Sequence, residues 1–168
     1  MKSKFALAIV MLVTACLPTS EPRDEVSLIW NPTVGMAATS RFDAQRFSGD
    51  WVVREGFDDA WHFDRFRFDV PRGSGIGTWE QPDAQAQVRL SQLGVFFLDY
   101  IGQRRMSEEV VVLWVDEGFR TAALAARNGR AAVIVDRKAT GGADRIEAAR
   151  VLLRKNGFDT SKLVPAGS

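Results

Sequence analysis

Cysteine and histidine are almost absent from this sequence of 168 residues, which contains one of each, Cys16 and His62. A single cysteine excludes an internal disulfide framework, a cysteine-rich zinc site and a two-thiol redox motif. A single histidine argues against a catalytic metal site built from several imidazoles. We therefore expect no metal and no cofactor, and the function classes that remain are binding, scaffolding and catalysis by carboxylates.

An excess of charge of one sign is also missing, because 22 lysines and arginines face 21 aspartates and glutamates. Nucleic-acid binding leaves a basic excess in a sequence, so no nucleic-acid partner is expected. Hydrophobic residues make up 46% of the chain and charged residues 26%, which is typical of a folded globular protein. At this length one domain is the default.

The apolar run near the N-terminus is too short to cross a bilayer. It extends from Phe5 to Val13 and follows Lys2 and Lys4, whereas a transmembrane helix needs about 20 apolar residues. A basic start followed by a short apolar run is typical of a secretory signal peptide, which we place at residues 1–15.

The only cysteine directly follows this leader. Val13-Thr14-Ala15-Cys16 resembles a bacterial lipobox, whose cysteine is acylated, for example with palmitate, and becomes the new N-terminus. The family prefers leucine where Val13 stands, and the alternative is an ordinary signal peptide cut after Ala15. The position of the cysteine favours lipidation. The resemblance implies a lipid anchor on Cys16 in the outer membrane, facing the periplasm. Residues 16–39 are then the lipidated cysteine and a tether, and residues 40–168 the folded domain.

The rest of the sequence predicts an all-β fold. From Gly49 onward, short β-rich runs are separated by glycine, proline, aspartate and asparagine. Eight runs with short links predict an eight-stranded up-and-down antiparallel β-barrel. The predicted strands are 51–55, 61–70, 75–80, 86–92, 95–101, 109–115, 121–127 and 131–136.

Three local patterns refine this fold. Asn128-Gly129 predicts a type I′ turn between the last two strands. The apolar parity changes within the second strand, which predicts a β-bulge near Asp64-Arg65. Residues 143–156 have apolar side chains at helical spacing, which predicts a C-terminal α-helix packed on the barrel exterior. Its expected partner is the alanine-rich strand at 122–126, although these alanines also suit a plain small-residue strand.

Both ends of the domain resemble a known family. The segment from Phe42 to Trp51, with Gly49-Asp50-Trp51 fitting the G-x-W motif, resembles the start of the bacterial lipocalins, lipoprotein relatives of apolipoprotein D. Arg137 closes the last strand where lipocalins carry an arginine, and Asn156 to Leu163 resembles the tail of this subgroup. Asp116 to Phe119 is a degenerate match to the second lipocalin motif. The resemblance implies the lipocalin barrel and a hydrophobic ligand.

The topology of a meander brings the motif residues together. The start of the first strand, the turn between strands six and seven and the end of strand eight lie at one end of the barrel. Trp51, Asp116 and Arg137 are therefore predicted to meet, with Arg137 over the Trp51 indole and Asp116 bonded to its turn. Together with Gly49 they are expected to be structural and to close this end.

The opposite end is expected to be an open mouth above a ligand-binding lumen. The apolar residues predicted to face this lumen are Phe66, Phe68, Trp79, Phe97, Val110, Val112, Trp114 and Val133. The same side chains could instead fill the barrel. Arg104 and Arg105 lie on a loop at the mouth and could bind a carboxylate or phosphate headgroup. The alternative for each arginine alone is an ordinary solvated side chain on this loop.

The leading hypothesis is a lipid-anchored lipocalin of the bacterial envelope that binds or transports a small hydrophobic molecule, a fatty acid or lysophospholipid, and is not an enzyme. The alternative is a structural or interaction lipoprotein with a filled barrel and no ligand. A third class, an enzyme on this fold, needs an acid–base pair in the lumen, for which the sequence offers Glu55 and Tyr100. Glu55 has the parity of Trp51 and could point inward, where a water or an arginine partner is expected.

Overall fold

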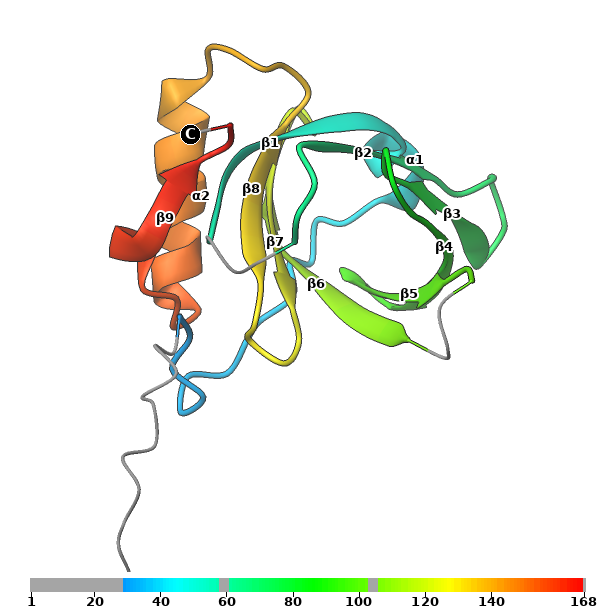
Figure 1. Ribbon diagram of the computed structural model, residues 1–168, viewed down its shortest axis with the longest axis horizontal. Coiled ribbons are helices and arrows are strands. Elements are labelled where there is room, and N and C mark those ends of the chain that lie inside the picture. Colours follow the sequence, from blue (N-terminus) through cyan, green and yellow to red (C-terminus); the bar gives the residue numbers. More distant parts are fainter. Residues whose placement is uncertain (1–28, 58–60, 103–105, 168) are drawn as a thin grey trace, which may run out of the picture.

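The computed structural model describes residues 29–57, 61–102 and 106–167. Within them a single antiparallel sheet closes into a barrel, because β1 pairs with both β8 and β2 (Figure 1). Its strands are β1 (Gly49–Phe57), β2 (Arg65–Asp69), β3 (Ile76–Glu80), β4 (Gln85–Gln92), β5 (Val95–Tyr100), β6 (Ser107–Val115), β7 (Thr121–Ala126) and β8 (Ala132–Asp136). The predicted eight-stranded barrel is confirmed.

Where the outer face of the barrel is exposed to solvent, inward-facing and outward-facing side chains alternate along each strand. In β2 and β3, buried residues alternate strictly with exposed ones, so one set of side chains faces the interior and the other faces water. In β7 and β8 every residue is buried. Both faces of these two strands are therefore covered, the inner one by the barrel core and the outer one by a helix.

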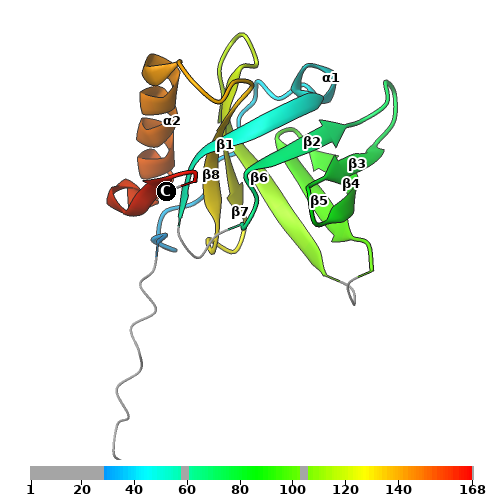
Figure 2. The same ribbon diagram turned by 45° about the horizontal axis from the view of Figure 1, so that its top comes forward.

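That helix is α2 (Ala143–Lys155), which lies along the outside of the barrel (Figures 1 and 2). Its buried face, which includes Ile146, Ala149 and Leu153, packs in one hydrophobic cluster with Ala123 and Ala125 of β7. The predicted partnership between the helix and the alanine-rich strand is confirmed, because small side chains let a helix approach a strand closely. Among the described residues no helix is long and apolar enough to span a bilayer.

Three short elements were not predicted. Helix α1 (Ala44–Phe47) precedes β1 and is capped by Asp43, whose side chain accepts hydrogen bonds from the backbone of Gln45 and Arg46. After α2, a 3₁₀ turn η1 (Thr160–Lys162) leads into β9 (Leu163–Pro165). Strand β9 pairs with the second half of β1, beyond the part that pairs with β2.

The described part of the predicted tether packs against the barrel. The Trp30 indole donates a 2.9 Å hydrogen bond to the carbonyl of Asn156 and packs on Gly129 in the β7–β8 link. Farther along, the Ala37 N–H donates to the Asn156 side chain at 2.8 Å. Residues 29–39 therefore lie along the outside of the barrel, from the end of α2 and the β7–β8 link to β6, where the Thr39 N–H donates to the Val112 carbonyl.

Two local predictions were wrong. Phe119 is the only described non-glycine residue with a positive φ, so Asn128 cannot occupy a type I′ turn. Instead the Gly129 N–H donates to the Ala126 carbonyl, which makes a β-turn over residues 126–129 whose positive φ, 74°, is at Gly129. No bulge forms near Asp64-Arg65, because β2 begins only at Arg65 and pairs with β1 in regular register.

Candidate functional site

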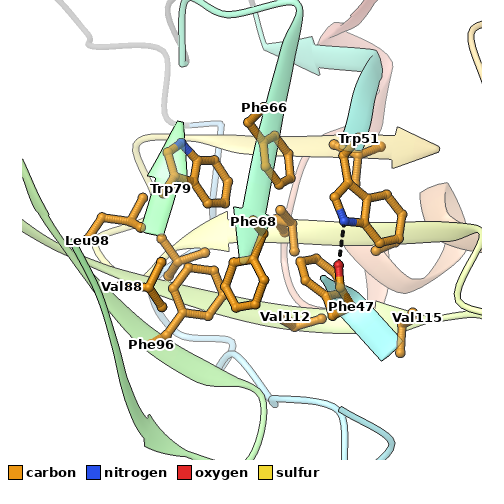
Figure 3. Close-up of a cluster of buried hydrophobic side chains, with 14 of the residues drawn as sticks. Phe47, Trp51, Phe66, Phe68, Trp79, Val88, Phe96, Leu98, Val112 and Val115 are labelled. Atoms are coloured by element: carbon orange, nitrogen blue, oxygen red, sulfur yellow. Dashed lines mark hydrogen bonds between the residues drawn. The ribbon is translucent and has the colours of Figure 1, made fainter. Parts of the chain in front are cut away.

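One half of the barrel interior is filled by aromatic rings. Phe66 stacks on Trp79 with 3.7 Å between ring centroids, and Phe47 of α1 stacks on Trp51 at 4.6 Å. Phe68 and Phe96 lie between these pairs and are fully buried (Figure 3). The interior next to α1 therefore holds packed side chains rather than a cavity.

Arg137 closes this end of the barrel from outside. Its guanidinium carbon lies 3.8 Å from the centre of the Trp51 ring, which is a cation–π contact. The guanidinium also donates hydrogen bonds of 2.9–3.2 Å to the backbone carbonyls of Arg46, Phe47, Ser48, Asp50 and Phe119. A Cβ on Gly49 would lie 3.1 Å from this guanidinium, at φ +110°, which explains the glycine two residues before Trp51.

Asp116 holds the β6–β7 turn at the same end. One carboxylate oxygen accepts hydrogen bonds from the backbone of Arg120 at 2.6 Å and of Thr121 at 2.7 Å. Burial raises the pKa of Asp116, but these bonds and those from the Arg120 side chain and Gly118 outweigh it, so the pKa is lowered. The motif residues thus lie together, as the meander predicts, and their contacts are structural.

The opposite end of the barrel is open. A pocket of about 690 Å³ lies there, which is within the range of small-molecule sites. Its apolar wall includes Trp61, Phe63, Tyr100 and Met106. Phe63 also contacts Trp79 edge-on at 5.8 Å, so the filled half of the barrel forms the floor of this pocket.

An acidic side chain lies within the apolar wall. The Oε2 atom of Glu108 accepts a 2.8 Å hydrogen bond from the Trp61 indole and a 3.4 Å hydrogen bond from the Tyr100 hydroxyl. Burial raises the pKa of Glu108, and the two hydrogen bonds oppose this only in part. Burial, together with the neighbouring Glu108 charge, raises the pKa of Tyr100 to about 12. At neutral pH the phenol is therefore a proton donor.

The basic side chains of the pocket lie on the β7–β8 side. Arg127 forms a 2.9 Å salt bridge with Glu109 and donates to the carbonyl of Met36. Arg130 also lines the pocket and is exposed, and its guanidinium has no partner among the described residues.

Six of the predicted lumen residues lie in the interior cluster. These are Phe66, Phe68, Trp79, Val110, Val112 and Val133. All are buried, and they belong to the filled core rather than to the wall of the pocket. Cys16, Arg104 and Arg105 lie outside the described residues.

Two predicted lumen residues point outward. The register of β6 against β7 shifts between Val112 and Trp114, so Trp114 packs in the outer cluster and Val115 takes the inward place. Phe97 is half-buried on the outer face, where the Arg89 guanidinium lies 4.6 Å from its ring centre. Its neighbour Phe96 is the residue inside the barrel.

Glu55 does not point into the lumen either. A register shift in β1 between Val53 and Glu55 turns its side chain toward α2. There it pairs with Arg150 through both oxygens, and this pairing is the main reason that the pKa of Arg150 is raised. A water or an arginine partner was expected, and the partner is an arginine, but its place on the outer helix was not predicted.

Glu108 was missed as a pocket residue, although the sequence carries a signal for it. Counting back by two from Val112 through Val110 places Glu108 on the inward face. Glu108 was instead placed at the end of a mouth link, because the sixth strand was predicted to begin at residue 109. Phe96 was missed because two adjacent phenylalanines fit either parity.

With this geometry in view, the chain can be compared with known proteins. No protein-family model matches it, and no curated protein matches its sequence. Lipocalin 12 from rat epididymis is similar in structure, with a TM-score of 0.59 and 15% identity over 81% of this chain and 93% of that one. Apocrustacyanin C1 has a TM-score of 0.59 and 12% identity over 79% and 88%.

A third similar structure is a variant of LTBP1 in complex with leukotriene C4. Its TM-score is 0.52, with 15% identity over 77% of this chain and 90% of that one. The three proteins share an eight-stranded antiparallel barrel with the chain described above. This chain therefore has the lipocalin fold.

Proposed function

We propose that this protein is a lipid-anchored lipocalin of the bacterial envelope that binds a small amphiphilic molecule and catalyses no reaction. The observation that carries the proposal is the pocket of about 690 Å³ at the open end, with an aromatic wall and charged groups at its rim. Neighbours of the same fold support it, since one was solved with leukotriene C4 bound. A fatty acid or a lysophospholipid is the ligand class that we propose.

The filled half of the barrel restricts where such a ligand binds. Because the interior rings are packed against one another, an acyl chain has no space beside them. The ligand therefore lies between Phe63 at the floor and the mouth. Burial of a chain segment against the aromatic wall supplies affinity at roughly 25 cal/mol per Å² before entropic losses.

The tether leaves the barrel at the same end as the pocket. Trp30 packs on Gly129 of the β7–β8 link, and that link also lines the pocket. If Cys16 carries a lipid, the intervening segment spans at most about 45 Å when extended, at roughly 3.5 Å per residue. A membrane anchor on Cys16 would then keep the open end within reach of the membrane.

The anchor is tested by metabolic labelling with palmitate in bacteria that express the full chain. We expect label in the wild-type protein and none in a Cys16→Ser variant, which is expected to leave the membrane fraction. Labelling of neither protein would favour the ordinary signal peptide over lipidation.

Ligand binding is tested by titrating the full Cys16→Ser chain with submicellar fatty acids and lysophospholipids, using calorimetry. Phe63→Arg places a charged side chain in the floor and is expected to abolish binding, whereas Trp114→Phe on the outer face is expected to leave it unchanged. Absence of saturable binding in the Cys16→Ser chain would favour the structural or interaction lipoprotein.

A further inference from the structure

The pocket contains a carboxylate that no described cation neutralises. Glu108 forms no salt bridge with any described residue, whereas its neighbour Glu109 is paired with Arg127 at 2.9 Å. Both hydrogen bonds that the Glu108 carboxylate receives from described residues end on Oε2, from Trp61 and Tyr100. The Oε1 atom therefore has no donor among the described residues.

The two donors hold the carboxylate in position without neutralising it. The Trp61 indole and the Tyr100 hydroxyl are uncharged donors, and each is itself part of the apolar wall. Withdrawal of a carboxylate from water without a counter-ion is costly, and the raised pKa of Glu108 reflects that cost. A ligand that places a positive charge beside Glu108 would offset this desolvation cost.

Aromatic side chains surround the same position. Trp61 stacks on Phe63 with 5.9 Å between ring centroids, and Tyr100 approaches Glu108 from β5. Faces of aromatic rings attract cations, and quaternary ammonium groups are often bound by such rings together with an acid. Ring faces, and a carboxylate with no cation paired to it among the described residues, thus favour the same type of group.

We propose that Glu108, together with Trp61 and Tyr100, forms a subsite for the amine or quaternary ammonium group of an amphiphilic ligand. This inference rests on the proposed function and narrows it, because it favours a headgroup that carries a positive charge over a free fatty acid. Glu108 is then the residue that determines headgroup preference.

The test compares three small amphiphiles that share a decyl chain and differ in headgroup charge: decyltrimethylammonium, decanoate and 1-decanol. Each is titrated below its micellar concentration into the full Cys16→Ser chain by calorimetry. We expect decyltrimethylammonium to bind roughly tenfold more tightly than decanoate, as a charge-assisted contact does.

Glu108→Gln is the decisive variant, because the amide keeps an oxygen for Trp61 and Tyr100 and removes the charge. We expect it to weaken decyltrimethylammonium binding roughly tenfold and to change decanol binding less than about twofold. Glu117→Gln, at the exposed β6–β7 turn at the closed end, is the matched control and is expected to change nothing.

The outcomes separate the two proposals. Tighter binding of decanoate than of decyltrimethylammonium, or an equal loss for all three compounds in Glu108→Gln, would overturn the cationic subsite and leave the ligand-binding function standing. Failure of all three compounds to bind would overturn the proposed function, and the subsite with it.

Discussion

The two ends of this barrel are built from the same strands, but side chains fill the interior at one end and leave a pocket at the other. At the closed end, α1 inserts Phe47 against Trp51, and Arg137 covers the indole from outside. At the open end no helix of the described residues enters, and a pocket of about 690 Å³ remains. An eight-stranded barrel is just wide enough to be filled by side chains or to hold one ligand. In this molecule side chains fill one half of the barrel, and the other half has room for a ligand.

The carboxylates at the two ends also differ, in how many of their oxygens accept hydrogen bonds. Asp116 at the closed end accepts hydrogen bonds through both oxygens, from backbone N–H groups and from Arg120. From the described residues, the Glu108 carboxylate at the open end accepts hydrogen bonds through one oxygen, Oε2. Saturated polar groups stabilise a fold, whereas an unsaturated one in a pocket is available to a ligand. The comparison predicts that closed-end substitutions change stability and open-end substitutions change binding.

The largest effect on stability is expected from Phe68→Ala, which removes a fully buried ring from the filled half. Loss of such a ring costs about 3–5 kcal/mol of unfolding free energy, measurable by urea denaturation. Phe97→Ala, on the outer face, is the matched control and should cost about 1 kcal/mol or less, since only a half-buried ring is lost. An unchanged stability of Phe68→Ala would contradict the claim that packed side chains fill this half of the barrel.

A smaller loss, about 1–3 kcal/mol, is expected from Asp116→Asn, because the amide cannot accept all the bonds that the carboxylate accepts. The lowered pKa of Asp116 sets the pH dependence: its stabilisation is present above the ordinary pKa of 3.8 and is lost as pH falls through the lowered value. Urea denaturation at neutral and acidic pH should show the two proteins converging in acid. A constant difference at every pH would contradict this.

The smallest effect on stability, about 1 kcal/mol or less, is expected from Tyr100→Phe, since its hydrogen bond to Glu108 is long, at 3.4 Å. The pKa of Tyr100 is raised from 10.0 to about 12. Its contribution is therefore present below pH 10 and is lost as pH rises through the folded pKa. The wild-type protein should lose thermal stability over this range, and Tyr100→Phe should lose less. Equal alkaline losses would show that Tyr100 is not the group that titrates.

Much of the barrel could be predicted from the sequence, because turn residues mark the strand ends and meander topology determines which links share an end. Side chains inside the barrel were less predictable where a bulge shifts parity. Trp114 and Glu55 both lie after such shifts, which depend on pairing with a neighbouring strand and leave no local signal. The division of the interior was also unpredictable, because it depends on Phe47 entering from α1, outside the strands.

The central claim, that the ligand binds at the open end alone, is tested most directly by nuclear magnetic resonance of the five tryptophan indole N–H groups during ligand titration. The probe is decyltrimethylammonium added to the full Cys16→Ser chain. Trp61 lines the pocket, Trp79 contacts Phe63 at the floor from within the filled core, and Trp51 lies under Arg137 at the closed end. We predict the largest shift for Trp61, a smaller one for Trp79 and none for Trp51. A shift of Trp51 as large as that of Trp61 would contradict the account.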